Sequence, residues 1–171
     1  KLYTALPYAH AHVRALVRAN KYYADTHAAR VLGAVLGELL VSVFEEHALD
    51  TLWHHPLLVP APTAPSRARH RGAHQVKDIV KNIPSHIRAQ YVYADVLSRH
   101  NRESQIAIPK SKRLKNVAGA FYVPEKKHRF VEGKNIFLID DVIESGATMK
   151  DMRRALYEAG ANDVIGIALA T

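Results

Sequence analysis

The sequence predicts an α/β fold in which helices cover both faces of an open, mostly parallel sheet. Residues 136–139 form an unbroken apolar run, as expected of a parallel strand that is buried on both faces. A turn of small residues and a helical pattern over residues 149–159 follow this run directly. Residues 57–59 begin a second strand–loop–helix unit. Two such units predict parallel strands joined by helices that pack on the sheet.

Helices are also predicted ahead of the first of these strands. An amphipathic helix covers Ala9–Asn20, and Asp25 or Thr26 caps a second helix whose apolar residues recur at helical spacing. Gly33 and Gly37 lie one turn apart in this second helix. Because glycine weakens a helix interior, the pair indicates a close packing contact.

The remaining elements follow from patterns of apolar residues and turns. A helix with four apolar residues on one face follows the basic loop Pro65–Gly72, and the segment Ser98–Lys115 is a predicted mobile loop because it has no clear periodicity. Gly160 is suited to end the helix that follows the central strand. Further strands are predicted at three positions: Tyr91–Leu97, Phe121–Val123 and Val164–Leu169.

Length and composition limit the class of protein. A chain of 171 residues fits one domain, residues 1–171, on which the helices of residues 8–48 pack. No apolar run is long enough to cross a bilayer, since Glu38 interrupts the most apolar helix. The absence of cysteine excludes disulfides and Cys-ligated zinc. We therefore expect a cytoplasmic protein without membrane contact.

The net charge of +8 and the pI of about 9.8 favour polyanionic partners. Such partners include nucleic acids and substrates that carry a pyrophosphate group. Net charge does not distinguish these two kinds of partner. The 11 histidines show no metal-ligand spacing and are expected to be solvated.

The stretch after the central strand has the chemistry of a sugar-phosphate site. Gly146 lets the backbone approach a phosphate closely, and the hydroxyl groups of Ser145 and Thr148 add hydrogen-bond donors beside a helix N-terminus. Asp140 and Asp141 would repel a phosphate, so they need another role. They are suited to accept hydrogen bonds from two sugar hydroxyls, or to hold hydrated Mg²⁺. The alternative is a solvated acidic turn without a ligand.

This stretch resembles the phosphoribosyl-pyrophosphate (PRPP) signature of type I phosphoribosyltransferases. The resemblance implies a type I phosphoribosyltransferase-like fold, PRPP as ligand and Mg²⁺ as cofactor. It implies that Asp140 and Asp141 hold the ribose 2′- and 3′-hydroxyls and that both also hold Mg²⁺, directly or indirectly. Glu144 occupies the position at which several purine phosphoribosyltransferases have an Asp that exchanges a proton with the base. The implied catalytic residues are therefore Asp140, Asp141 and Glu144. The implied loop for the 5′-phosphate consists of Ser145, Gly146, Ala147 and Thr148.

The flanking segments narrow the resemblance to the ComF family, which is associated with competence for DNA uptake. Lys21 and Tyr22 fit that family's pattern, as do Gln75, Asn116 and Gly119–Phe121. The family often carries a four-cysteine zinc module, which this sequence lacks, and Ala73 and His74 replace an aromatic residue and Asn. The resemblance implies a pyrophosphate loop containing Arg67, Arg71 and Gly72, and a flexible loop containing Gln105 and Arg113.

Three functions are consistent with these features. The first is Mg²⁺-dependent transfer of a phosphoribosyl group from PRPP to an unidentified acceptor. The second is a non-catalytic module that senses PRPP or docks to single-stranded DNA and DNA-uptake proteins. The third is a basic DNA-binding protein whose acidic motif is unused. All three functions are compatible with a homodimer.

Overall fold

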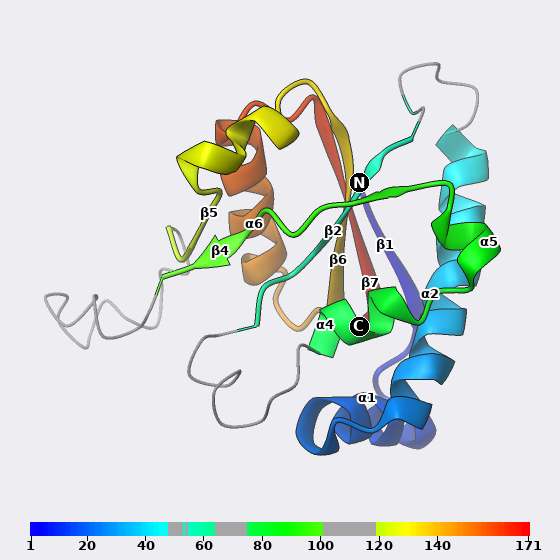
Figure 1. Cartoon of the computed structure of the whole chain (residues 1–171). Coiled ribbons are helices and arrows are strands. Elements are labelled where there is room, and N and C mark those ends of the chain that lie inside the picture. The colour runs from blue at the N-terminus through cyan, green and yellow to red at the C-terminus, as the bar shows by residue number, and fades with distance from the viewer. Residues whose placement is uncertain (48–52, 54, 64–74, 101–118) are drawn as a thin grey trace, which may run out of the picture.

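The computed structural model describes residues 1–47, 53, 55–63, 75–100 and 119–171 (Figure 1). A five-stranded sheet of order β1-β7-β6-β2-β3 forms its centre, and every neighbouring pair of strands is parallel. The central strand β6 is buried over its first six residues and is flanked by strands on both sides. The strands are β1 (Leu2–Leu6), β2 (Leu57–Pro60), β3 (Val92–Tyr93), β6 (Asn135–Val142) and β7 (Asp163–Ala170).

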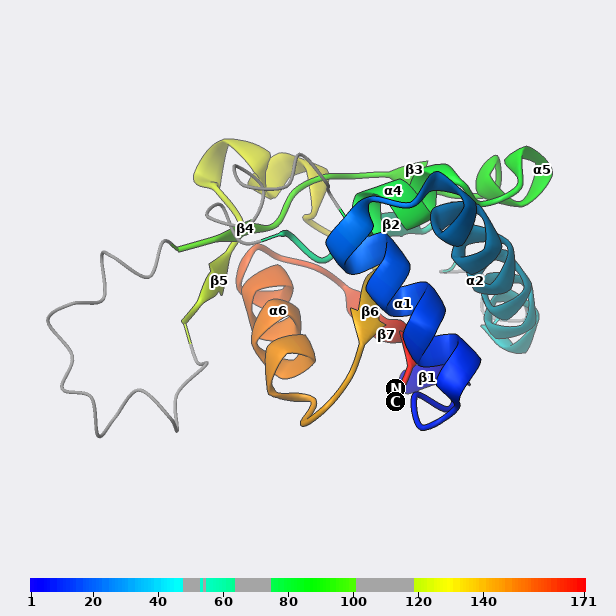
Figure 2. The ribbon, with the colours of Figure 1, turned by 90° about the horizontal axis from the view of Figure 1, so that it is seen from below.

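Helices cover both faces of this sheet, which confirms the predicted fold class (Figure 2). One face carries α1 (Ala11–Tyr23), α2 (Thr26–His47), α4 (Gln75–Lys81) and the short α5 (Ser85–Arg88). The opposite face carries α6 (Ala147–Glu158).

The long helix α2 begins at an N-cap and packs closely on its neighbours. The Asp25 carboxylate accepts hydrogen bonds from the N–H groups of His27 and Ala28 at 2.8 and 3.1 Å, so Asp25 is the cap. A Cβ atom on Gly33 would lie 2.6 Å from the backbone of Asn82, which follows α4. Glycine is therefore needed at this position because the two backbones nearly touch. This confirms the predicted close contact.

Helix α2 corrects one expectation. By length and composition it could cross a membrane, although we expected no such segment. Its buried side includes Leu32, Leu36 and Leu40, whose side chains are fully buried in the hydrophobic core. Packing in the core accounts for the hydrophobicity of this helix without a membrane.

Two strand predictions differ from the structure. Strand β1 was not predicted, yet it pairs with β7 and forms one edge of the sheet. The predicted strand Tyr91–Leu97 is wrong in extent, because only Val92 and Tyr93 pair with β2 and residues 94–97 are irregular. The chain then enters β4 (Ser98–Arg99), which pairs antiparallel with β5 (Phe121–Tyr122) outside the main sheet.

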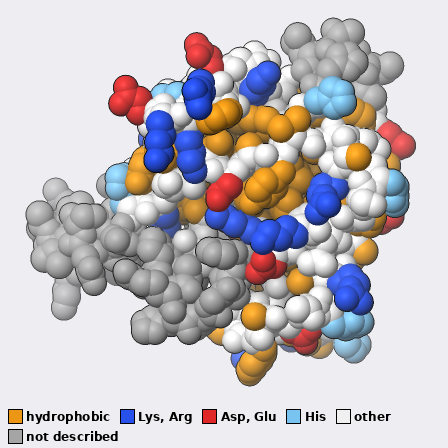
Figure 3. Space-filling view, viewed as in Figure 1, with side chains coloured by type: hydrophobic (Ala, Val, Ile, Leu, Met, Phe, Trp, Pro, Cys, Tyr) orange, Lys and Arg blue, Asp and Glu red, His pale blue; other side chains and the backbone are white. Residues whose placement is uncertain are grey.

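The 3₁₀ helix η4 (Glu125–Phe130) follows β5 and leads into β6. The surface on this side of the molecule carries hydrophobic side chains near its middle, with Lys and Arg side chains around them (Figure 3).

Candidate functional site

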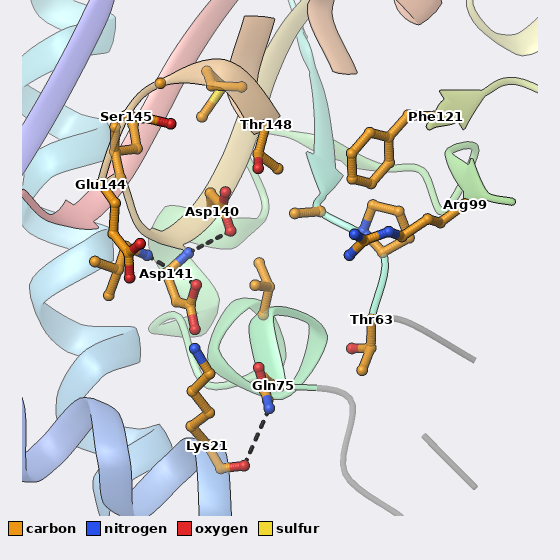
Figure 4. Close-up of a pocket in the computed structure, with 17 residues that line it drawn as sticks. Lys21, Thr63, Gln75, Arg99, Phe121, Asp140, Asp141, Glu144, Ser145 and Thr148 are labelled. Carbon is orange, nitrogen blue, oxygen red and sulfur yellow. Dashed lines mark hydrogen bonds between the residues drawn. The ribbon is translucent and has the colours of Figure 1, made fainter. Parts of the chain in front are cut away.

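A cavity of about 430 Å³ lies at the carboxyl ends of β6 and β2 (Figure 4). Ligands of open α/β sheets bind at this end of the strands. Residues from five parts of the chain line the cavity: the end of α1, the segment after β2, the start of α4, the β4–β5 pair, and the stretch from β6 into α6. The site is therefore assembled by the tertiary fold.

Asp140 and Asp141 form the floor of the cavity, where β6 ends. The strand continues through both residues to Val142, further than predicted. Asp140 is 9% exposed, and its Oδ1 accepts a hydrogen bond of 2.9 Å from the backbone N–H of Asp141. The Oδ1 of Asp141 accepts 2.8 Å from the N–H of Val142. These two bonds fix both carboxylates at the strand end.

Burial of Asp140 perturbs its ionisation. Removal of the carboxyl group from water raises its pKa to about 8, and the neighbouring charge of Asp141 adds to the rise. Lys21 opposes this rise through its positive charge. A buried carboxyl group that lacks sufficient positive charge around it is a feature of a site that awaits a cation or a hydrogen-bonding ligand.

The turn between β6 and α6 forms the wall beside these carboxylates. Gly146 caps α6 with φ of 71°, a left-handed conformation that side chains disfavour. The Ser145 hydroxyl accepts a long hydrogen bond of 3.4 Å from the N–H of Ala147. The first N–H groups of an α-helix lack intrahelical partners and attract anions. Ser145, Gly146 and Thr148 line the cavity, and Ala147 does not line it.

Lys21 enters the cavity from the C-terminal end of α1, and its side chain points toward Asp141 (Figure 4). Two buried amides hold this helix end in place. Gln75 Nε2 donates to the carbonyl of Lys21 at 3.1 Å, and Asn20 Nδ2 donates to the carbonyl of Gln75 at 3.4 Å. These bonds tie the end of α1 to the start of α4, and so they place a positive charge opposite the acidic pair.

Arg99 and Phe121 form the opposite wall. The Arg99 guanidinium lies 5.2 Å from the centre of the Phe121 ring, within the range of a cation–π contact. Phe121 is held from α6: its N–H donates to Asp151 at 3.0 Å, and its carbonyl accepts from Arg154 at 2.9 Å. Asp151 also accepts 2.8 Å from the N–H of Gly119.

The structure brings together most of the predicted residues on the central stretch and adds others. Glu144 lines the cavity and is exposed, as the outermost of the three acidic residues. The lining residues Lys21, Arg99 and Phe121 were not predicted as site residues. Lys21 and Phe121 were noted only as positions that fit the family's pattern, and Arg99 lies in the segment predicted as a mobile loop. The predicted loop residues Arg67, Arg71, Gly72, Gln105 and Arg113 lie outside the described residues.

The described residues fit Mg²⁺ only together with a substrate. No group of three or more His, Asp or Glu side chains able to hold a metal occurs within the described parts of the chain. Asp140 and Asp141 supply two carboxylates, whereas Mg²⁺ requires about six oxygen ligands and usually takes one or two carboxylates together with substrate phosphates and water. The pair is therefore suited to a metal that arrives with a phosphate ligand.

Comparison with curated proteins finds two competence proteins. No family model matches the chain. The chain is 32% identical over 106 residues to competence protein ComFC of Streptococcus pneumoniae (strain ATCC BAA-255 / R6), a match that covers 62% of this chain and 44% of that protein. It is 33% identical over 108 residues to competence protein ComFC of Bacillus subtilis (strain 168), covering 62% of this chain and 40% of that protein. The match thus spans less than half the length of either relative.

Comparison with solved structures gives the fold. The glutamine phosphoribosylpyrophosphate amidotransferase of B. subtilis superposes with a TM-score of 0.51 at 17% identity, over 88% of this chain and 30% of that one. The parallel sheet, the helices on both faces and the N-terminal helices agree with this fold. The chain is therefore similar to competence protein ComFC over 62% of its length, and it has the fold of the type I phosphoribosyltransferases.

Proposed function

We propose that the chain binds PRPP in the cavity at the end of β6 and, with Mg²⁺, transfers the phosphoribosyl group to an acceptor. The observation that carries this proposal is the juxtaposition of an acidic pair, of which Asp140 is buried, with a helix N-terminus in one cavity. A ligand that satisfies both must carry hydroxyl groups and a phosphate a short distance apart. A ribose 5-phosphate group has both.

Each wall of the cavity then has a role in holding PRPP. Ser145, Gly146 and Thr148, with the N-terminus of α6, hold the 5′-phosphate. Asp140 and Asp141 accept hydrogen bonds from the ribose 2′- and 3′-hydroxyls, which fixes the sugar. The resemblance also assigns Ala147 to the phosphate loop, where its N–H donates to the Ser145 hydroxyl at 3.4 Å.

The transfer breaks the bond between ribose C1 and the pyrophosphate oxygen, and it forms a bond from C1 to the acceptor. Mg²⁺, when bound, supplies positive charge to the leaving pyrophosphate. Arginine guanidinium groups suit the same phosphate oxygens. By resemblance we assign this role to Arg67 and Arg71, with Gly72 in the same pyrophosphate loop, and we assign Gln105 and Arg113 to closure over the ligand.

The names of the two curated relatives support a role in competence. We propose that the chain acts in the cytoplasm, in the handling of incoming single-stranded DNA together with DNA-uptake proteins. The net charge of +8 supports contact with a polyanion. The proposal includes an acceptor that is still to be identified and a homodimeric state, and both can be measured directly.

A second candidate function is a PRPP sensor without turnover. Glu144, which the resemblance places beside the acceptor base, is exposed, and the described residues give its carboxylate no hydrogen-bond or ion-pair partner. An acid or base in catalysis needs a fixed geometry. This observation favours binding without transfer.

Isothermal titration calorimetry with PRPP, with and without Mg²⁺, tests the binding. We expect binding that requires Mg²⁺, and we expect its loss in the double variant Asp140→Asn with Asp141→Asn. Equal binding by the double variant would show that the ribose site lies elsewhere. Release of pyrophosphate from the PRPP–Mg²⁺ complex, assayed with each nucleobase and with single-stranded DNA, separates the enzyme from the sensor.

A further inference from the structure

A second cavity, of about 760 Å³, lies outside the PRPP cleft. It is lined by β3 and the residues that follow it, by η4, and by the turn before β6. We call it the β3 groove. It shares no lining residue with the cleft, so nothing in the proposed PRPP site accounts for it.

Large hydrophobic side chains line this groove in the open. Val92 and Phe130 are each 50% exposed, and Tyr93 is 43% exposed. They lie beside Val96 and Leu57, which are buried beneath them in the same cavity. Contiguous exposed hydrophobic residues in a soluble fold mark an interaction site more often than scattered ones do.

The backbone of the groove is open at the sheet edge. The N–H groups of Val92 and Ala94 donate to the carbonyls of Pro56 and Leu58, each at 3.1 Å. Because successive residues of a strand point their polar groups to opposite sides, the N–H and C=O of Tyr93 face away from β2. Strand β3 is the last strand of its sheet. An extended chain that enters the groove therefore meets a donor and an acceptor.

The charge around the groove is positive. Lys127, Arg129 and Lys134 line it, against a single carboxylate from Asp95. That carboxylate already accepts 2.6 Å from Lys77, and Lys127 donates to the Asp95 carbonyl oxygen at 2.6 Å. The charges of Lys127, Arg129 and Lys134 are thus not balanced by a carboxylate within the described residues. Figure 3 shows Lys and Arg side chains around hydrophobic side chains on this face.

We propose that the β3 groove binds an extended acidic peptide segment of a partner protein. An aliphatic or aromatic side chain of that segment packs between Tyr93 and Phe130, and the backbone beside it pairs with the open edge of Tyr93. Carboxylates on either side of this anchor pair with Arg129 and Lys134. Positive rim charges suit such flanks and speed their association.

A nucleic acid is the competing occupant, since bases stack on Tyr and Phe beside cations. The aliphatic floor and the open backbone pair favour a peptide, because an edge strand pairs with an extended chain and an aliphatic floor offers no aromatic surface on which a base stacks. The proposal does not depend on PRPP binding, since the two cavities share no residue.

A library of random nine-residue peptides displayed on phage tests the proposal. The selection uses the wild-type chain, and the variant Arg129→Glu with Lys134→Glu serves for counter-selection. Both residues are exposed, so the fold should persist, and circular dichroism checks it. We expect enriched peptides with one or two hydrophobic residues between Asp or Glu residues, and synthetic copies should bind the variant at least about tenfold more weakly.

Two further variants sharpen this result. Tyr93→Ala with Phe130→Ala should weaken the same peptides, whereas Arg18→Glu with Lys126→Glu changes the net charge equally, outside the groove, and should leave peptide affinity nearly unchanged. A 20-mer of oligothymidylate is titrated in parallel. Enrichment of no peptide over the variant, or of neutral or basic peptides, would overturn the proposal. So would oligothymidylate binding that falls with the groove variants as much as peptide binding does.

Discussion

Replacement of Asp140 by Asn should stabilise the free protein while it removes ligand binding. In the folded protein, burial raises the pKa of Asp140 from 3.8 to about 8. A carboxyl group whose pKa is raised on folding stabilises the fold fully below its unfolded pKa, and this contribution is lost as the pH rises through the folded pKa. The Asn side chain does not ionise in this pH range, so the variant does not lose this stability as the pH rises.

The expected gain follows from the shift. A pH of 7 lies about three units above the ordinary pKa of this carboxyl group. At about 1.36 kcal/mol per unit, the gain in unfolding free energy has an upper limit of about 4 kcal/mol. The buried amide of Asn adds N–H donors that lack partners, at about 1–3 kcal/mol. Asn keeps an oxygen to accept the N–H of Asp141, so that bond survives. A net gain of about 2 kcal/mol corresponds to a rise of about 4–8 °C in melting temperature.

Urea denaturation between pH 4 and pH 9 measures the effect. The difference in unfolding free energy between variant and wild type should grow from about pH 4 to about pH 8 and then stay constant. Asp151 provides the matched control. Burial would raise its pKa, but hydrogen bonds from Arg154 and two backbone N–H groups lower the pKa below its usual value, so Asp151→Asn should destabilise the protein. A difference for Asp140→Asn that is flat with pH, or a loss of stability at pH 8, would refute the reasoning.

Three other perturbations have expected outcomes. Gly33→Ala places a methyl group against the backbone of Asn82, so we expect a net loss of about 2 kcal/mol in urea denaturation, whereas Gly37→Ala meets only side chains at 3.1 Å and should change stability less. Arg67→Ala and Arg71→Ala should each weaken PRPP binding by about 1–3 kcal/mol in calorimetry and leave the melting temperature of the free protein unchanged; a drop in melting temperature with intact affinity would make the loop structural. Lys21→Met removes the positive charge that lowers the pKa of Asp140, so in this background the difference in unfolding free energy that Asp140→Asn causes should become constant at a higher pH than in the wild-type background. An unchanged pH would show that Lys21 does not act on this carboxyl group.

The parts of the fold with a strong local signal could be predicted from the sequence. The apolar run that becomes β6, the small-residue turn and the two helical glycines each carry their reason within a few residues. Strand β1 lacks such a signal, because it is short, lies at a sheet edge and is partly exposed. Residues 94–97 contain β-forming residues, but no strand among the described residues pairs with them to extend β3, so pairing overrides propensity.

The candidate site also has one part that could be predicted from the sequence and another part that could not. Asp140 to Thr148 form one continuous motif, and the chemistry of the motif can be read from residue types alone. Lys21 lies far away in the sequence. It is held at the cavity because the side-chain amides of Asn20 and Gln75 donate to the backbone carbonyls of Gln75 and Lys21, respectively. Arg99 and Phe121 arrive through an antiparallel pair outside the main sheet. Such convergence depends on the tertiary structure and leaves no local pattern.

Helix α6 sets the width of the cleft. Its first turn lies at the candidate phosphate loop, and Asp151 and Arg154 hold the backbone of Phe121 on the far wall. Gly146 and Asp151 are five residues apart, about 7.5 Å along a helix. The spacing between the two walls therefore depends on the rise per residue of one rigid helix. We therefore expect a ligand that displaces the loop to displace Phe121 as well, because the same helix holds both walls.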